Sequence, residues 1–445
     1  MKIIIAGAGG IGFHLAKLLS TAQHDIVLVD SSQDVLDYAQ SHLDVMTVLG
    51  DATSLQVLEE VGVSSAAIFL AVTTLENDNI VSCMLAKKLG AQQTIARINK
   101  VDNLQRSFRD TFQELGVDKI ISPSFLAAQE IERLIKTGQV TDSFDFEGGK
   151  ISLVGITIQE QYNYIGKSIE EIKAAKNVTY NPIAILRGNE TILPRPAIRI
   201  QKGDHIYFIS PKSELDDLLA TIGSRQTTIK RIMIIGGNEI SLQVCRLLED
   251  DYHITLVESN EKICKRFASE LKNILIIKGD TSNIELLREE GLSDMDAFIA
   301  LTPNSEINII TCLLAAQEGI KRTIALVDNT EYTHISQHVG VDTMINKKLI
   351  AANYMFRFVR KGTIEAITSL HGVNAEVIEY VVQKESRITK YNLREIKFPE
   401  NAIIGSVIRG EEHIIPTGDF RLQLDDKVIV LALPDALSKV EDIFR

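Results

Sequence analysis

The sequence predicts an α/β protein with two Rossmann-like, doubly wound parallel sheets, each followed by a small α+β domain. Three observations lead to this prediction. From Ile3 to Asp30 the chain has a strand, a glycine turn, a helix and a second strand that ends in a carboxylate, which is typical of a dinucleotide-binding βαβ unit. A degraded form of the same passage returns from Arg231 to Glu258. The length of 445 residues is also too great for one hydrophobic core and indicates several domains.

The two halves match each other as a duplication. An offset of 229 residues superimposes Gly7 on Gly236, and the offset drifts to 222 near the end of each half, where Gly188 matches Gly410. Matching landmarks with slowly drifting spacing indicate a duplicated domain pair of roughly 225 residues rather than a solenoid repeat.

Within the first half, short runs rich in Ile and Val alternate with helical patterns, as in a parallel doubly wound sheet. The predicted strands are Lys2–Ala6, Ile26–Asp30, Met46–Leu49, Ala67–Ala71, Thr94–Ile98 and Lys119–Ile121. Ser122 and Pro123 have the character of an N-cap and a first helical residue, so a helix is predicted from there to about Lys136. Thr137–Asp142 is predicted to be a linker.

From Ile151 the pattern becomes strand-rich and predicts a small α+β domain. Its predicted elements are strands at Ile151–Ile158, Thr179–Arg187 and His205–Ile209, a short helix at Ser168–Ala175 and a turn at Gly188-Asn189. The second half repeats this order, with a helix at 347–361. We therefore predict Rossmann-like domains at 1–137 and 226–362, and small α+β domains at 138–225 and 363–445.

The opening glycine turn is predicted to hold the diphosphate of a nucleotide. Gly7 permits the tight turn, Gly9 lets the backbone approach a pyrophosphate, and Gly12 lets the helix pack closely on the sheet. Phosphate would then bind the N–H groups at the start of the helix. The residues of this turn are Gly7, Ala8, Gly9, Gly10, Ile11 and Gly12. The alternative is a glycine turn that serves packing alone.

Asp30 is the candidate for binding the ribose. It ends the second strand 18 residues after Gly12, near the ~20 expected for such a carboxylate. Its charge would accept hydrogen bonds from the ribose hydroxyls, which contribute roughly 1.5–3 kcal/mol, and would repel a 2′-phosphate. The predicted ligand is therefore NAD(H) or an adenine nucleotide rather than NADP(H).

Further candidates lie after the third and fourth strands, at the sheet edge where open α/β folds bind ligands. They are Asp51, Ala52, Thr53, Thr73, Thr74 and Asn77. Helix capping is the alternative role for these polar side chains. Arg97 in the fifth strand would be buried, so it either binds a ligand phosphate or forms a structural ion pair.

The second half keeps weaker counterparts of these residues. Its candidates are Gly236, Asn238, Glu258, Asp280 and Thr302. Asn238 and Ser241 replace two glycines of the turn, and Leu326 stands where the first half has Arg97. Asn tolerates positive φ, so the turn can survive. The added Cβ and the missing arginine leave two interpretations open, a second nucleotide site and a structural remnant.

The sequence shows no catalytic residues and no metal-ligand spacing. The nine histidines have no partnering motif of the kind a dehydrogenase needs beside its nicotinamide. His14 follows the glycine turn, and we expect it on a helix surface rather than against a ligand. A duplicated domain pair with one degraded nucleotide site favours a sensor, not an enzyme. An NAD-dependent oxidoreductase is the alternative.

Bulk properties narrow the location and the partners. The net charge of −12 argues against nucleic acid and against direct adhesion to anionic lipid. No apolar run approaches the ~20 residues of a spanning helix, and the start of the chain lacks a signal-peptide pattern. The four scattered cysteines fit a reducing compartment. We expect a cytoplasmic protein whose membrane role, if any, runs through a protein partner.

These features resemble the RCK family of cytosolic regulators of potassium transport, whose units join a KTN and a TrkA-C domain. The resemblance covers essentially the whole chain. It rests on the glycine turn, Asp30, the Gly50-Asp51 turn, Thr73 and Arg97, and on the strand-rich domain around Gly166-Lys-Ser168. Two such units in tandem are similar to the peripheral subunits of bacterial Trk potassium uptake systems.

The resemblance implies a homo-oligomeric ring, expected to be a tetramer, in which units exchange the helix after the sixth strand. The ring would be attached to the inner face of the cell membrane through a channel or transporter subunit of the TrkH or TrkG type. NAD(H) would bind, with ATP and ADP as competing ligands. The residues matched to the family's nucleotide contacts are Gly7, Gly9, Gly12, Asp30, Asp51, Thr73 and Arg97. A third hypothesis is a nucleotide-binding assembly without a channel.

Overall fold

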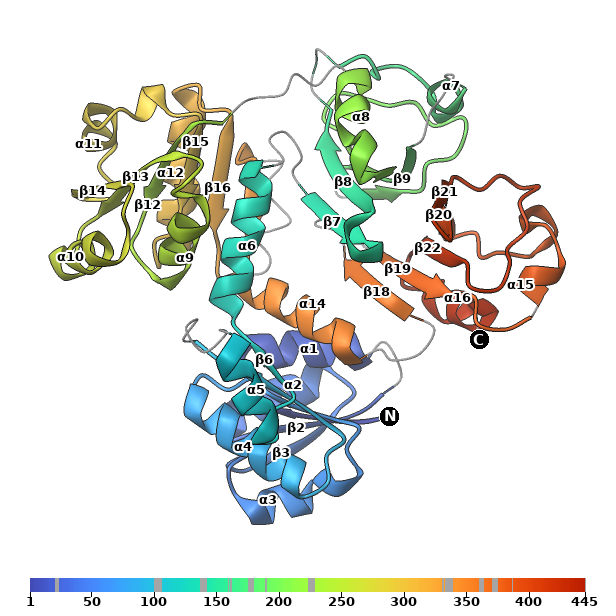
Figure 1. Cartoon of the computed structure of the whole chain (residues 1–445), viewed down its shortest axis with the longest axis horizontal. Coiled ribbons are helices and arrows are strands. Elements are labelled where there is room, and N and C mark those ends of the chain that lie inside the picture. The colour runs from blue at the N-terminus through green and yellow to red at the C-terminus, as the bar shows by residue number, and fades with distance from the viewer. Residues whose placement is uncertain are drawn as a thin grey trace.

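The first Rossmann domain is built on a six-stranded parallel sheet in the order β3-β2-β1-β4-β5-β6 (Figure 1). The structure is a computed structural model that describes residues 1–20, 24–99, 106–136, 142–158, 160, 162–174, 180–188, 190–222, 229–329, 332, 339–359, 364–369, 375–385 and 387–444. The strands are β1 Lys2–Ala6, β2 Asp25–Asp30, β3 Met46–Leu49, β4 Ile68–Ala71, β5 Gln93–Arg97 and β6 Lys119–Ile121. The helices are α1 Gly10–Ser20, α2 Gln33–His42, α3 Leu55–Glu60, α4 Glu76–Lys88, α5 Arg106–Glu114 and α6 Pro123–Lys136. The predicted strands and the predicted helix after Ser122 are thus confirmed, with shifts of one residue at some ends.

The second Rossmann domain repeats this plan with the order β14-β13-β12-β15-β16-β17. Its strands are β12 Arg231–Ile235, β13 His253–Glu258, β14 Ile274–Lys278, β15 Ala297–Ala300, β16 Arg322–Leu326 and β17 Thr343–Ile345. Its helices are α9 Glu239–Leu248, α10 Glu261–Glu270, α11 Ile284–Glu289, α12 Ser305–Gln317 and α14 Lys347–Val359. The predicted helix at 347–361 is α14, and its last two predicted positions lie outside the described residues.

Each small domain has a five-stranded antiparallel sheet, in the orders β10-β9-β11-β8-β7 and β18-β19-β22-β20-β21. The first contains β7 Asp142–Phe146, β8 Ile151–Thr157, α7 Ile169–Lys173, β9 Asn181–Arg187, β10 Glu190–Ile192, β11 His205–Pro211 and α8 Leu215–Ile222. The second contains β18 Ile364–Ser369, β19 Glu376–Val381, α15 Arg387–Lys390, β20 Ala402–Arg409, β21 Glu412–Ile414, β22 Lys427–Ala432 and α16 Leu437–Phe444. The predicted strands and helix of the first small domain are confirmed in type.

The linker prediction is wrong at Asp142, which begins β7 because it pairs with Gly155 of β8. The rest of that predicted linker, residues 137–141, lies outside the described residues, as do Asn189 of the predicted turn and Thr179 at the predicted start of a strand. The structure also adds β10 and α8, which the sequence pattern did not predict.

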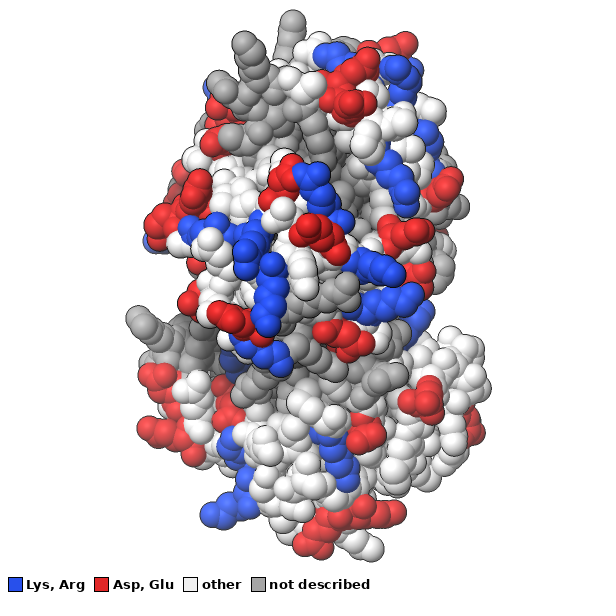
Figure 2. Space-filling model, turned by 90° about the vertical axis from the view of Figure 1, so that its right-hand side faces the viewer, with Lys and Arg blue, Asp and Glu red and all other residues white. Residues whose placement is uncertain are grey.

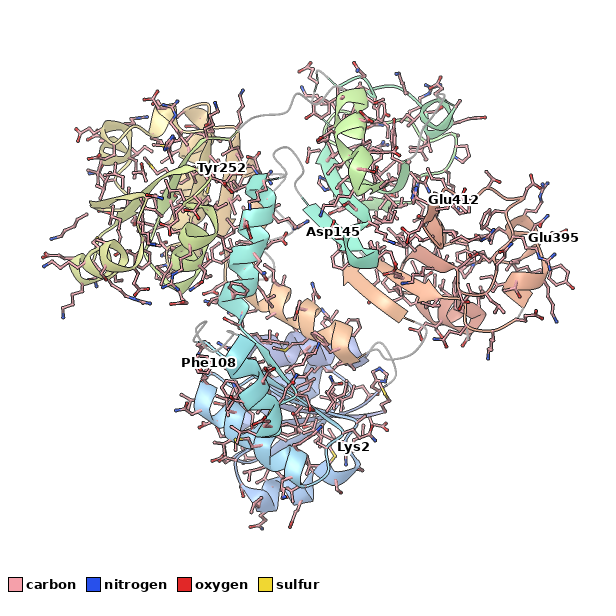
Figure 3. All side chains as sticks on the ribbon, in the orientation of Figure 1. Lys2, Phe108, Asp145, Tyr252, Glu395 and Glu412 are labelled. Carbon is pink, nitrogen blue, oxygen red and sulfur yellow. The ribbon has the colours of Figure 1, made fainter. Side chains whose placement is uncertain are left out.

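The two Rossmann domains exchange one helix each. α6 leaves the first sheet and packs on α9 of the second domain, and α14 leaves the second sheet and packs on α1 of the first (Figure 1). α6 gives the second domain's core Ala127, Ala128, Ile131, Leu134 and Ile135. α14 gives the first domain's core Ala351, Ala352, Met355, Phe356 and Val359. Tyr252 closes the second core beside the end of α6 (Figure 3). Each half therefore completes the core of the other.

The two small sheets pack against each other through one shared apolar layer. A Cβ on Gly405 would lie 2.5 Å from Cδ1 of Ile209 in the other small domain, so the sheets approach too closely for a side chain there. Nδ2 of Asn181 donates to the carbonyl of Gly405 at 2.9 Å, and Lys427 pairs with Glu147 at 2.5 Å. The two halves are thus in contact in two places: the Rossmann domains through their exchanged helices, and the small domains through their sheets.

One ion pair is repeated in the two small domains. Arg187 forms two bonds to Asp204, and Arg409 forms two bonds to Asp426, at 2.7–2.8 Å. Both carboxylates are buried, so each arginine compensates a charge that burial alone would penalise. These carboxylates therefore have a structural role.

Candidate functional site

The first glycine turn has the geometry expected of a phosphate-binding elbow. Gly7 has a φ of +100°, and a Cβ there would lie 2.8 Å from the backbone N of Thr73. A Cβ on Gly12 would lie 1.8 Å from the carbonyl oxygen of Gly7, whereas Gly9 has no atom within 4 Å of its Cβ position. Gly7 and Gly12 are therefore required by the protein's own packing. Gly9 is not, and it faces open space.

A cavity of about 640 Å³ opens beside this elbow, at the carboxyl edge of the first sheet. We call it the first cavity. Ten of the residues proposed from the sequence line it: Gly7, Gly9, Gly10, Ile11, Asp30, Asp51, Ala52, Thr73, Thr74 and Arg97. The structure thus brings together residues from the carboxyl ends of five strands, β1 to β5, as expected for an open α/β sheet.

Asp30 is held at the mouth of the elbow by backbone donors. Its carboxylate accepts from the N of Ala8 at 2.7 Å and from the N of Ser32 at 3.0 Å. These bonds fix the carboxylate in the cavity wall and leave each oxygen a second lone pair. Asp30 can therefore still accept from a hydroxyl of a ligand.

Arg97 enters the cavity wall without an ion pair in the described ranges. Its Nε is buried and has no hydrogen-bond partner, and burial lowers the pKa of its guanidinium. A buried, unpaired donor is costly, so the structural ion pair that the sequence left open is absent from the described part of the chain. Arg97 is therefore a cation in the wall of the first cavity and is available to a ligand phosphate.

Asn79 fixes the loop that carries Thr73. Its Oδ1 accepts from the N and the Oγ1 of Thr73 at 2.9 and 2.7 Å, and its Nδ2 donates to the carbonyls of Thr73 and Arg97. Asn308 makes the same four bonds in the second half, to Thr302 and Leu326. Sequence reasoning missed both asparagines, although the 229-residue offset matches them.

The second half also supplies part of the first cavity. Lys347, Lys348 and Asp328 line it, together with Pro123 and Ser124 at the start of α6. The lysines begin α14, the helix that packs on α1. The sequence analysis did not identify them, because only the helix exchange places them here.

The second elbow is closed by its own side chains. Oδ1 of Asn238 accepts from the N of Ile240 and of Ser241 at 2.8 and 3.1 Å, and Oγ of Ser241 donates to the carbonyl of Gly236 at 2.5 Å. These are the amides that would bind a phosphate at a helix start. The Glu258 carboxylate in turn accepts from the backbone N of Gly237 at 2.5 Å. The protein's own side chains therefore occupy the backbone groups that would otherwise bind a phosphate at this elbow.

A cavity of about 230 Å³, the second cavity, lies beside this elbow and includes Asn238, Thr302 and Leu326. Ser124, Asp328 and Lys347 line both cavities. The two cavities therefore share a wall where the exchanged helices begin.

Some proposed residues do not line either cavity. They are Ala8, Gly12, Thr53, Asn77, Gly236, Glu258 and Asp280. Thr53 donates its N and Oγ1 to Oδ1 of Asp51, both at 2.8 Å, which lowers the pKa of Asp51. Asn77 is exposed on α4. Any contact of these residues with a ligand stays a prediction.

The described residues hold no cluster of metal-ligating side chains, and His14 lies away from both cavities. Within them, no three His, Cys, Asp or Glu side chains gather as a metal site. His14 is partly buried on α1 rather than exposed, and burial, aided by Lys17, lowers its pKa to about 4. The imidazole is therefore neutral at pH 7, and it lines neither cavity. No helix in the described ranges has both the length and the apolar character to cross a membrane.

Taken together, the fold and the cavities define a tandem Rossmann-fold protein whose two elbows meet at exchanged helices. Comparison with known proteins gives the family. The TrkA-N domain family matches residues 3–123 and 232–347, and the TrkA-C domain family matches residues 153–223 and 377–445. The chain belongs to the TrkA family.

Curated relatives cover the whole chain. The Trk system potassium uptake protein TrkA homolog 1 of Methanosarcina mazei is 31% identical over 454 residues, covering 100% of both chains. The TrkA homolog of Archaeoglobus fulgidus is 32% identical with the same coverage. The Trk system potassium uptake protein TrkA of Azorhizobium caulinodans is 30% identical and covers 100% of this chain and 99% of its own.

Solved structures share the fold. The crystal structure of the GsuK RCK domain has a TM-score of 0.62 at 15% identity and covers 100% of this chain and 94% of its own. The GsuK channel bound to NAD has a TM-score of 0.62 at 16% identity, covering 100% of this chain and 78% of its own. The arrangement of two Rossmann and two small domains is thus shared with RCK domains.

Proposed function

We propose that this chain is the cytoplasmic regulatory subunit of a potassium uptake system and that its first cavity binds NAD(H) or an adenine nucleotide. Relatives that match this chain over its whole length are named Trk system potassium uptake proteins. The observation that carries the proposal is the composition of the first cavity. Its walls include Gly9 and Asp30 of one half and Lys348 of the other, so an occupant contacts both Rossmann domains.

Such a ligand regulates by changing the angle between the two domains. A ligand can shift two conformations only by its difference in affinity for them, typically about 1–3 kcal/mol. In this chain, α6 packs on α9 and α14 packs on α1, so each exchanged helix contacts the opposite domain. A small change at the elbow is therefore transmitted to the other half and on to a partner.

NAD(H) and ATP or ADP compete for this site in the proposal. GsuK, a protein of similar fold, has been solved bound to NAD and bound to ADP. The volume of about 640 Å³ is within the range of ligand pockets. Asp30 favours ligands with a free ribose 2′-hydroxyl and disfavours NADP(H).

We propose one nucleotide per chain. Asn238 and Ser241 already satisfy the amides and the carbonyl of the second elbow, and Leu326 lies where the first half has Arg97. A phosphate would have to displace these internal bonds without an arginine to compensate. The second domain is then a structural partner of the first.

We propose occupancy, not catalysis, as the output of the site. An oxidoreductase needs an acid–base group beside the nicotinamide. The only ionisable side chains that line the first cavity are Asp30, Asp51, Asp78, Asp328, Arg97, Lys347 and Lys348, in the described part of the chain. These charges suit the binding of a polyanionic ligand, and none of them belongs to histidine, the side chain that most often serves as general acid and base.

Homo-oligomerisation, with a tetramer as the expected state, is supported by apolar side chains on outer helices. Val81 on α4 and Ile310 on α12 occupy matched positions and are 43% and 56% exposed. Phe108 on α5 is also exposed, at the outer surface of the first domain (Figure 3). Matched exposed apolar residues on two helices favour contact with further copies of the chain. Size-exclusion chromatography with light scattering of V81E/I310E tests this.

The proposed membrane partner is a channel or transporter subunit of the TrkH or TrkG type, reached from the inner face of the membrane. Acidic and basic side chains are intermingled on the face shown in Figure 2. With a net charge of −12, this mixed surface gives no support for nucleic acid as a partner.

We also propose that the chain has four domains, at 1–137, 138–225, 226–362 and 363–445, and limited proteolysis can test these boundaries.

The function is tested by potassium flux in proteoliposomes that hold the membrane partner. We expect flux to depend on this chain and to change with NADH or ATP, and D30N to lose the nucleotide response. Flux that ignores the chain would contradict the regulatory role. Steady NADH consumption with carbonyl compounds would instead support the oxidoreductase.

A further inference from the structure

One edge of the first Rossmann sheet combines an unpaired strand with exposed apolar side chains. β3 is the end strand of this sheet and, among the described strands, pairs with β2 alone. Met46 and Leu49 of β3 are 59% and 55% exposed, and Leu55 at the start of α3 is 52% exposed. We call β3 with these three side chains the outer edge. Free backbone groups on an edge strand can pair with another strand, and apolar side chains gathered on a surface mark an interaction site.

The chain around the outer edge carries acidic residues without basic ones. Between Lys17 and Lys87 the sequence has ten Asp and Glu residues and no Lys or Arg. Exposed carboxylates of this stretch lie on α2, on α3 and just before β3, at Asp34, Asp37, Asp44, Glu59 and Glu60. None of these five forms an ion pair with a described residue. The outer edge is therefore apolar along its strand and negatively charged around it.

The matched edge of the second Rossmann domain lacks this character. Residues 247–315, which the 229-residue offset matches to 18–86, contain six Lys and Arg. Three of them, Arg266, Lys278 and Arg288, stand at the positions of Asp37, Leu49 and Glu59. All three form ion pairs with carboxylates of their own domain. A lysine on an edge strand is also a common device against strand addition, so the second edge is blocked where the outer edge is open.

We propose that an extended, basic cytoplasmic segment of the membrane partner docks along the outer edge and adds a strand beside β3. This inference rests on the proposed function and adds to it the surface on which the partner binds. Cytoplasmic loops of membrane proteins carry an excess of Lys and Arg, which complements the carboxylates of α2 and α3. Backbone hydrogen bonds to β3 would give affinity, and apolar side chains of the segment would cover Met46, Leu49 and Leu55. In Figure 1, α3 lies at the end of the first domain away from α14, so docking here leaves the helix exchange intact.

The test measures the affinity of the full chain for the purified membrane partner held in nanodiscs, by biolayer interferometry. L49K and D37R/E59R give the outer edge the residue types of the second edge. Two variants of the second edge are matched controls. L275K changes an apolar side chain of β14 that is 59% exposed, and E285R/E289R reverses two exposed carboxylates of α11. Thermal unfolding and NADH titration check that each variant folds and keeps its first cavity.

We expect L49K and D37R/E59R each to weaken partner binding roughly tenfold or more, through lost apolar contact and through charge repulsion. Wild-type binding should also weaken as salt rises, whereas L275K and E285R/E289R should bind as wild type does. Equal affinity of the outer-edge variants and their controls would overturn the inference. Light scattering provides a second check, because a changed mass of L49K alone with unchanged partner binding would assign the outer edge to contact between copies and overturn it too. Failure of wild type to bind the membrane partner would overturn the proposed function itself.

Discussion

Arg97 offers a direct separation of binding from folding, because its Nε is buried without a hydrogen-bond partner. The substitution Arg97→Leu copies the second half, where Leu326 occupies the matched position and is 7% exposed. The change removes a charge that burial disfavours, as the lowered pKa of Arg97 indicates. It also removes the cation that we assign to a ligand phosphate.

The two effects have opposite signs. An unsatisfied buried donor costs about 1–3 kcal/mol, so the ligand-free variant should gain about 1–2 kcal/mol in free energy of unfolding. A charge-assisted bond to phosphate contributes about 1.5–3 kcal/mol, so nucleotide affinity should fall roughly 10- to 100-fold. We therefore expect Arg97→Leu to be more stable than wild type without ligand and to bind nucleotides less tightly.

The assay combines thermal unfolding without ligand and calorimetric titration with NADH and ATP. Arg97→Lys is the control, because it keeps the charge and should retain part of the affinity. A variant that is less stable than wild type and binds with unchanged affinity would refute the reasoning. That result would mean that Arg97 supports the fold rather than a ligand.

Four further predictions follow from the same geometry. Gly9→Ala should leave the free energy of unfolding without ligand unchanged or slightly higher, since no atom lies within 4 Å of the new Cβ. The same change should weaken the binding of NADH and ATP about tenfold or more in fluorescence titration. Unchanged affinity would place the diphosphate elsewhere. N238G/S241G removes the side-chain hydrogen bonds that close the second elbow. The free energy of unfolding in urea should fall by about 1–2 kcal/mol, and calorimetry should show a weak second binding event. A single, unchanged binding event would mean that these bonds do not block the second site. His14 has a folded pKa lowered to about 4 by burial and by Lys17, so the unfolded state binds the extra proton as pH falls from 6.5 toward 4. Urea unfolding at pH 7 and pH 5 should show a loss of about 2 kcal/mol that His14→Gln lacks, and equal losses in both proteins would exclude His14 as the source. Met355→Ala, at a fully buried position of α14, should cost about 2–5 kcal/mol in thermal or urea unfolding, and a negligible loss would mean that α14 does not stabilise the first domain.

The Rossmann strands could be predicted because buried parallel strands appear as continuous apolar runs. Ile3, Ile4 and Ile5 of β1 are all fully buried, and such runs are easy to recognise between helical patterns. β7 was missed for the opposite reason. Its sequence Asp142–Phe146 alternates polar and aromatic residues at a sheet edge and pairs only with β8, so local composition resembles a linker.

The elbow residues of the first cavity could be predicted because one local motif contains them. Lys347 and Lys348 could not, because they reach the cavity only through the exchange of α14, which local patterns do not encode. Asn79 was missed because it acts through bonds to Thr73 and Arg97, which come together only in the folded sheet. A buried asparagine repeated at the 229-residue offset was the available signal.

The most direct test of the central claim is the stoichiometry of NADH and ATP binding to the intact chain by calorimetry, with D30N beside wild type. We predict one site per chain, competition between the two ligands, and strongly weakened binding in D30N. Two equal sites per chain, or no binding of any adenine nucleotide, would contradict this account.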